Sequence, residues 1–261
     1  PVVVALMACL PLAAFAGIKG GADKPRAGAG STLSAPAQAR PKATGFVEAN
    51  LLETFYHELG HALIDVMQLD VYGPEEYAAD FFAAYMLDHM YPPDQTRNLV
   101  HQVTAAYRLD SGGGAEGGSG ALWDLHARPM QRYYNLACLY YGAAPETRED
   151  ALSDLGLPEA RAETCADEYA NTALAWGHVL EQLGEQAPGQ SLTLDWVLDA
   201  QSPAARFISA QVDRLNQIMA LPEPVTVSVI PCGAVNAFYD PGEHEILICT
   251  EWADHLAKIA P

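Results

Sequence analysis

The sequence predicts an α+β fold that is mostly helical and ends in a small β-hairpin or sheet. Between residues 46 and 221, apolar residues recur at the three- and four-residue steps of amphipathic helices. The segment after residue 224 is rich in β-branched residues and contains a turn signal. Half of the 261 residues are hydrophobic and 18% are charged, so the chain can bury a substantial core and is not disordered overall.

The helices follow in chain order from this periodicity. We expect the first from Phe46 to about Gln68. Pro74 suits the first turn of a second helix, which should end near Met90 before Pro92-Pro93. Further helices are expected near residues 94–108, 128–141, 148–154, 158–184 and 203–221.

The strands are expected near the end of the chain. Residues 225–230 are β-rich, and residues 235–239 and 245–249 flank Asp240-Pro241-Gly242. An Asp-Pro-Gly segment between two apolar runs favours a turn, so we predict a β-hairpin. Residues 111–120 are almost all Gly and Ser and predict a surface loop.

The N-terminal region divides into two segments ahead of a domain at 45–261. Residues 1–16 are almost wholly apolar and end in Ala14-Phe15-Ala16, which is typical of a secretory signal peptide. Residues 17–44 are rich in Ala, Gly and Pro and predict a flexible linker. We therefore expect an exported protein, periplasmic or extracellular. Lipoprotein anchoring at Cys9 fits less well, because the apolar run continues past it, and a buried N-terminal helix is the other alternative.

Four cysteines remain beyond Cys9, namely Cys138, Cys165, Cys232 and Cys249. An even set in an exported chain favours two disulfides. Three pairings are open, and proximity in sequence favours Cys138–Cys165 and Cys232–Cys249. Free buried thiols are the alternative.

The net charge of −19 limits the partners. Phosphate contacts need a basic surface, so nucleic acid is not expected, and an anionic membrane surface is disfavoured for the same reason. We expect no membrane span in the mature form. The oligomeric state stays open.

The segment His57-Glu58-Leu59-Gly60-His61 is an H-E-x-x-H motif on the first predicted helix. Residues four apart share one helix face, so both imidazoles can bind one metal ion, and the motif favours one zinc ion per chain. Glu58 is then placed to act as general base towards a zinc-activated water. Two ordinary histidines on an amphipathic helix are the alternative.

A third ligand is expected from the second helix. Glu76 and Asp80 resemble the E-x-x-x-D pattern of gluzincin peptidases, which implies Glu76 as the ligand and Asp80 as the carboxylate that orients a ligating His. Glu75 and Asp65 are competing ligands. Glu75 and Glu76 could also serve only the helix N-terminus.

Peptide hydrolysis also needs a hydrogen-bond donor for the oxyanion. His126 is the first candidate, and Tyr133 or Tyr134 the second. A solvated His beside the Gly-rich loop, with both tyrosines packed in a helix core, is an equal alternative.

From Phe46 to Ala257 the chain resembles a family of exported bacterial zinc metallopeptidases. The resemblance rests on Tyr56–Ala84 and on later segments, which include Gln131–Asn135, Cys232–Pro241 and Ile248–Glu251. It implies a zincin-like fold and a peptide or protein substrate, without naming that substrate. In ordinary zincins the sheet precedes the metal helix, so here we expect the C-terminal hairpin to fold back beside that helix.

The rival hypothesis is a secreted binding protein that keeps zinc for structure, or an inactive relative of the peptidases. A purely structural site is usually closed by four protein ligands and does not need Glu58. The intact motif therefore favours an enzyme.

Overall fold

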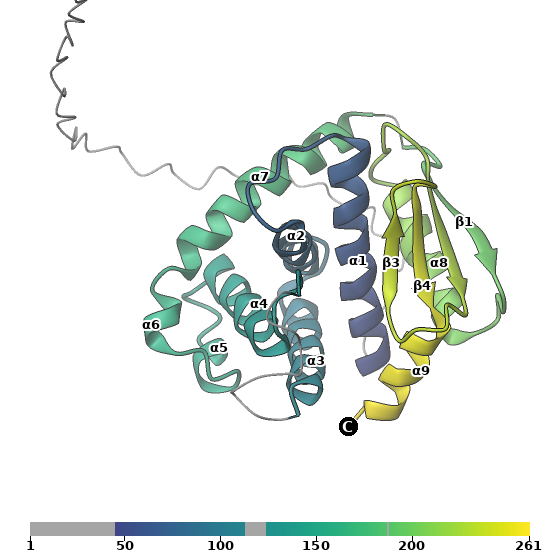
Figure 1. Cartoon of the computed structure of the whole chain (residues 1–261). Coiled ribbons are helices and arrows are strands. Elements are labelled where there is room, and N and C mark those ends of the chain that lie inside the picture. Colours follow the sequence, from purple (N-terminus) through teal and green to yellow (C-terminus); the bar gives the residue numbers. More distant parts are fainter. Residues whose placement is uncertain (1–44, 113–123, 187) are drawn as a thin grey trace, which may run out of the picture. The chain divides into compact units, whose positions relative to one another are not determined.

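Helix α1 (Phe46–Val66) lies between a group of helices and a β-sheet in this computed structural model (Figure 1). The structure describes residues 45–112, 124–186 and 188–261, all of which belong to one compact unit. The predicted signal peptide and linker, and most of the predicted Gly/Ser loop, lie outside the described residues. Fifteen of the 21 residues of α1 are buried, including Asn50, Glu53, His57 and Glu58. A helix buried on nearly all sides is a core element, so its polar residues must find partners inside the protein.

The other helices of this group are α2 (Glu75–His89), α3 (Pro93–Asp110), α4 (Pro129–Ala143), α5 (Asp150–Ser153), α6 (Glu159–Ala162) and α7 (Cys165–Glu185). Helices α2 and α3 pack on α1, and α4 packs on α2, α3 and α7. Among the described residues, no helix combines the length and apolar character needed to cross a membrane.

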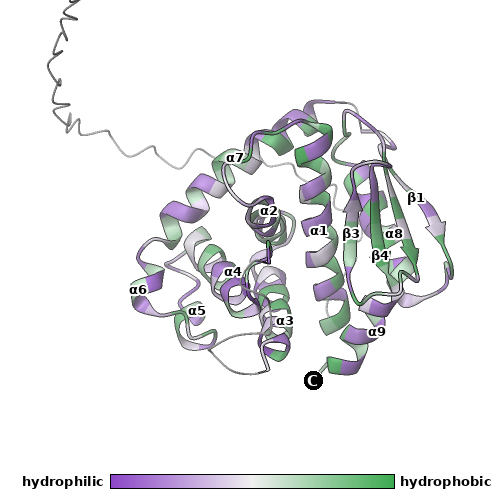
Figure 2. Ribbon diagram, in the orientation of Figure 1, coloured by the Kyte–Doolittle hydropathy of each residue, from purple (hydrophilic) through white to green (hydrophobic). Residues whose placement is uncertain are grey.

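The sheet has four strands in the order β1-β2-β4-β3, with β1 (Leu192–Val197), β2 (Val225–Ile230), β3 (Ala237–Asp240) and β4 (Glu245–Cys249). Strands β1, β2 and β4 are parallel, whereas β3 pairs antiparallel with β4 as the predicted hairpin. The central strands β2 and β4 are hydrophobic over most of their length (Figure 2). Helix α8 (Pro203–Asn216) follows β1 and packs on it and on α1, and α9 (Thr250–Ile259) ends the chain.

The hairpin folds back onto the metal-motif helix, as expected. Strands β3 and β4 contact α1, and the hydroxyl of Tyr239 donates a hydrogen bond of 2.8 Å to Asp65. From α9, the indole of Trp252 donates to the hydroxyl of Thr54, at 3.0 Å. The fold class predicted from the sequence, α+β and mostly helical with a small sheet, is confirmed.

The structure differs from the prediction in four places. The single helix expected over residues 158–184 is two helices, α6 and α7. The helical conformation is interrupted at Glu163-Thr164, just before the disulfide-bonded Cys165. The sequence did not predict β1 or α9. The helix expected to reach Leu221 ends at Asn216, and the apolar residues beyond it enter the core from a non-helical segment.

Gly60 sets the distance between α1 and α2. A Cβ atom at this position would lie 3.1 Å from the Cα of Ala79 and 3.2 Å from the ring of Phe82. Overpacking of this kind typically costs about 1–3 kcal/mol. The glycine therefore offsets its low helix propensity by allowing α2 to come close to the histidines on α1.

Two disulfides join Cys138 to Cys165 and Cys232 to Cys249, which is the predicted pairing. The first connects α4 to the start of α7, and Gly142 on α4 allows the two helices to come this close. A Cβ atom on Gly142 would stand 2.0 Å from the carbonyl oxygen of Cys165. Both bonds are consistent with an exported protein, since disulfides persist in oxidising compartments.

Candidate metal centre

Three donor atoms from α1 and α2 converge beside the H-E-x-x-H motif. The Nε2 atoms of His57 and His61 lie 3.2 Å apart. Oε2 of Glu76 lies 3.2 Å from Nε2 of His57 and 3.5 Å from Nε2 of His61. The structure thus brings together the three residues that the sequence proposed as ligands.

The spacing of these donors fits a shared cation. At ligand bonds of about 2.0–2.2 Å, tetrahedral geometry separates neighbouring donors by about 3.3–3.6 Å. Oε2 of Glu76 is buried and has no hydrogen-bond partner of its own, although imidazole nitrogens of His57, His61 and His126 lie within 3.5 Å of it. A carboxylate oxygen that lies close to imidazole nitrogens without a hydrogen bond to them is expected where all of these atoms point at one shared cation. The donor set of two imidazoles and one carboxylate suits a divalent transition metal.

The electrostatics of the cluster also favour positive charge. Burial by itself disfavours a protonated His57, but Asp80 and Glu76 outweigh that effect and raise its pKa to about 10. The pKa of His61 is raised in the same way, with burial opposed by Glu76 and Glu75. A site that draws protons onto both imidazoles will also attract a metal cation, which competes with those protons.

Each histidine has a carboxylate behind its other ring nitrogen. Oδ1 of Asp80 lies 2.8 Å from Nδ1 of His57. Oε1 of Glu75 lies 2.6 Å from Nδ1 of His61. Such contacts fix the ring orientation and tautomer and leave Nε2 for a metal. Glu75, which the sequence offered as a competing ligand or a helix-terminal residue, therefore orients His61.

Arg132 on α4 extends this support into the core. Its guanidinium donates to both carboxylate oxygens of Asp80, at 2.6 and 3.1 Å, and to Glu53 at 3.1 Å. Glu53 in turn accepts a 2.6 Å hydrogen bond from the hydroxyl of Tyr107. The buried charges are thus paired and hydrogen-bonded, as burial requires. The chain from Tyr107 to Asp80 holds the carboxylate that orients His57.

Sequence reasoning did not assign Glu53 or Arg132 to this network. One signal was available, because Glu53 lies four residues before His57 and so shares the helix face on which the sequence predicts the metal ligands. A carboxylate on such a face needs a partner. Nothing in the sequence points to Arg132, 79 residues away, as that partner.

Glu58 is buried next to the histidines, with 7% of its surface exposed. Burial raises the pKa of its carboxyl group, while His57 and His61 act in the opposite direction. A carboxylate with a raised pKa is a better proton acceptor than an exposed one.

His126 lies on the solvent side of Glu76. Its Nε2 is 3.1 Å from Oε2 of Glu76, and Asp124 binds both its backbone N–H and its Nδ1. About half of the side chain is exposed. His126 stands outside the group of His57, His61 and Glu76, whose donor atoms all lie within 4.8 Å of one another. It can therefore reach a molecule that approaches the cluster from solvent.

The side chains of Tyr133 and Asp65 have partners away from the cluster. The hydroxyl of Tyr133 donates to the carbonyl of Leu155 and accepts from Arg108, and Tyr134 packs edge-on against Tyr133. Asp65 accepts from Tyr239 on the sheet side of α1. Of the candidate oxyanion donors, His126 has a ring nitrogen within 3.1 Å of Glu76, whereas the hydroxyl of Tyr133 is bound elsewhere.

Two further groups of potential ligands among the described residues have other partners. Cys232 and Cys249 form a disulfide, and Glu251 accepts from the backbone N–H groups of Cys232 and Gly233. The second group is His101, Asp150 and Asp154. Its two carboxylates already bind the guanidinium of Arg97.

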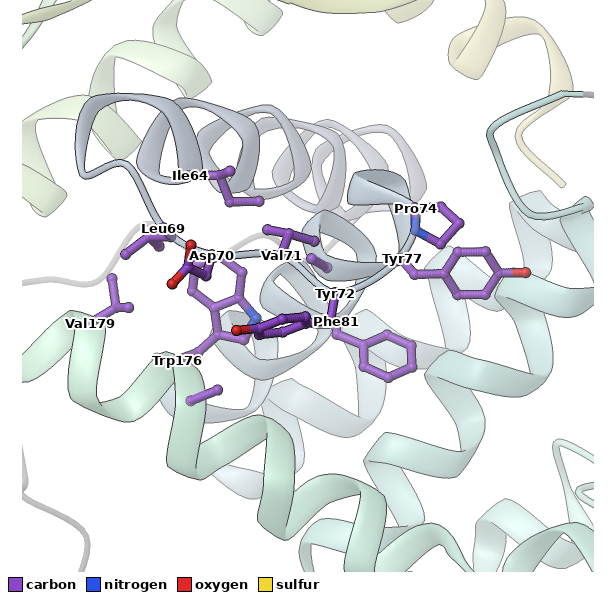
Figure 3. A pocket seen from close by; sticks show the side chains of 13 residues that line it. Ile64, Leu69, Asp70, Val71, Tyr72, Pro74, Tyr77, Phe81, Trp176 and Val179 are labelled. Atoms are coloured by element: carbon purple, nitrogen blue, oxygen red, sulfur yellow. The ribbon is translucent and has the colours of Figure 1, made fainter. Parts of the chain in front are cut away.

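An apolar cavity of about 450 Å³ lies beside the first turn of α2. Figure 3 shows Ile64 entering it from α1, and Trp176 and Val179 from α7. Tyr77, which follows Glu76 directly, also lines it. The cavity and the donor cluster therefore lie on neighbouring faces of α2.

The model of a protein family described as "Putative metallopeptidase" matches residues 30–180 and 198–260, which is most of the chain. Searches of the curated proteins and of the solved structures give no match.

Proposed function

This chain belongs to that metallopeptidase family, and from this premise we propose that it hydrolyses peptide bonds with one zinc ion held by His57, His61 and Glu76. The convergence of these three donors carries the proposal. Two imidazoles and a carboxylate, joined by no fourth donor from the residues that the structure describes, are the usual ligands of a catalytic rather than a structural zinc ion. Membership of the family implies a metal, and the donor chemistry favours zinc.

When bound, zinc acts as a Lewis acid that acidifies water and polarises a carbonyl group. Glu58 accepts the proton of the attacking water on its carboxylate. As the water oxygen bonds to the carbonyl carbon and the C–N bond breaks, Glu58 passes that proton to the leaving nitrogen. Its buried position among the histidines supports this role.

His126 is proposed to stabilise the oxygen that gains negative charge. Its Nε2 faces the cluster, and Asp124 holds its Nδ1. A donor at this distance from the three ligands can contact a substrate oxygen without occupying a ligand position.

The test is cleavage of a mixed peptide library by the purified chain. Cleavage is expected to stop when a chelator removes the metal and to return when zinc is added back. A chain that carries zinc and cleaves no peptide would contradict the proposal. It would favour a zinc-stabilised binding protein instead.

The two neighbouring glutamates on α2 should respond differently to the same substitution. Glu76→Gln is expected to weaken zinc binding far more than Glu75→Gln, because Glu76 offers a ligand atom whereas Glu75 only orients His61. Loss of an orienting carboxylate typically costs about 10–100-fold in affinity, and the same is expected for Asp80→Asn. Competition with a zinc chelator measures all three variants. Equal losses at Glu75 and Glu76 would contradict the assignment of the third ligand.

A further inference from the structure

Arg214 on α8 is a buried cation for which the described part of the chain supplies no anionic partner. Only 7% of its surface is exposed. Its Nη2 donates to the backbone carbonyl of Met90, and its guanidinium lies 4.5 Å from the ring centre of Tyr91. Its Nε and Nη1 atoms are buried without hydrogen-bond partners, so no carboxylate of the described residues binds either atom.

Two other buried side chains offer donors in the same place. Gln211 lies one turn earlier on α8 and is fully buried. Its Oε1 accepts from the hydroxyl of Tyr91 at 3.3 Å, and its Nε2 has no partner. Tyr56, from α1, is also fully buried beside Tyr91 and near Arg214, and its hydroxyl can donate a hydrogen bond.

The missing component must accept several hydrogen bonds and carry negative charge. Arg214 Nε and Nη1 and Gln211 Nε2 can only donate. Water would accept at most two of these bonds and would leave the guanidinium charge uncompensated, which is costly in the interior. A spherical anion accepts hydrogen bonds from several directions and neutralises the charge. Unsatisfied buried groups of this kind often mark a bound ion.

We propose that a small monovalent anion of the size of chloride binds beside Arg214, between α1, the C-terminal end of α2 and α8. Such an ion would join α8 to α1 at Tyr56, the residue before His57. It would therefore stabilise the packing of the sheet side of the fold against the helix that carries the metal motif.

The test is thermal unfolding of the zinc-loaded protein while chloride replaces gluconate at constant ionic strength. A ligand that binds only the folded state raises its stability, and saturating chloride is expected to raise the Tm by about 5 °C. The proposal fails if the Tm does not depend on chloride, because the cluster would then hold water molecules only.

Three variants locate the effect. Arg214→Met removes the charge and Gln211→Glu supplies an internal carboxylate, so both should lose the chloride dependence. Arg97→Met is the matched control, since Arg97 is half-exposed and already paired with Asp150 and Asp154. It should respond to chloride like the wild type. A chloride effect that survives in Arg214→Met would overturn the proposal. If Arg214→Met does not fold, a chloride effect that survives in Gln211→Glu would overturn it instead.

Discussion

Replacing Glu58 with Gln is expected to leave zinc bound and to lower kcat/KM for peptide cleavage by at least about 10²–10⁴-fold, the usual contribution of general acid–base catalysis. Glutamine keeps the size of the side chain but cannot accept the proton of the attacking water. His57, His61 and Glu76 remain in place to hold the ion. The measurement pairs a peptide-cleavage assay with metal analysis of the same preparation.

The matched control is Glu181→Gln, an exposed glutamate on α7. It should cleave like the wild type. If Glu58→Gln retains zinc and also cleaves at the wild-type rate, the proposed role of Glu58 is wrong. Loss of zinc in this variant would mean that Glu58 supports the metal site as well as the chemistry.

Replacing His57 or His61 with Ala is expected to abolish zinc binding, from about one ion per chain to none. Each substitution removes one of three protein donors, and two donors do not hold zinc against water and competing chelators. Alanine is compatible with the helix, so α1 should persist. Metal analysis after dialysis, with circular dichroism to check folding, gives the result.

His178→Ala serves as the control for both histidine variants, because His178 is exposed on α7 and distant in sequence from the motif. It should keep its zinc. Unchanged zinc in both His57→Ala and His61→Ala would place the metal elsewhere in the chain.

The elements with strong local signals were predictable from the sequence. Helices α1, α2 and α3 fall within about two residues of the expected bounds, because their apolar periodicity agrees with the Pro residues that start or end them. The hairpin of β3 and β4 followed from its Asp-Pro-Gly turn.

Elements that depend on distant partners were missed. The segment that forms β1 alternates apolar Leu192, Leu194 and Trp196 with polar residues, but the alternation is short and four of its six residues are exposed in succession. It is a strand because it pairs with β2. Helix α9 was missed although its apolar residues recur at helical spacing, with Leu256 buried and Trp252, Ala253 and Ile259 packed against the core. The same limit applies to the site. The i, i+4 spacing indicated the ligands on α1, but only the fold brings Arg132 to Asp80.

The positions of the two disulfides bear on the order in which the protein matures. One ties α4 to α7 and the other closes the segment between β2 and α9, so neither bond crosses the contact between α1 and α2 that presents the three donors. We therefore expect that metal binding does not require either disulfide, and that the disulfides can form without the metal. Non-covalent packing alone, centred on Gly60, aligns the two ligand-bearing helices.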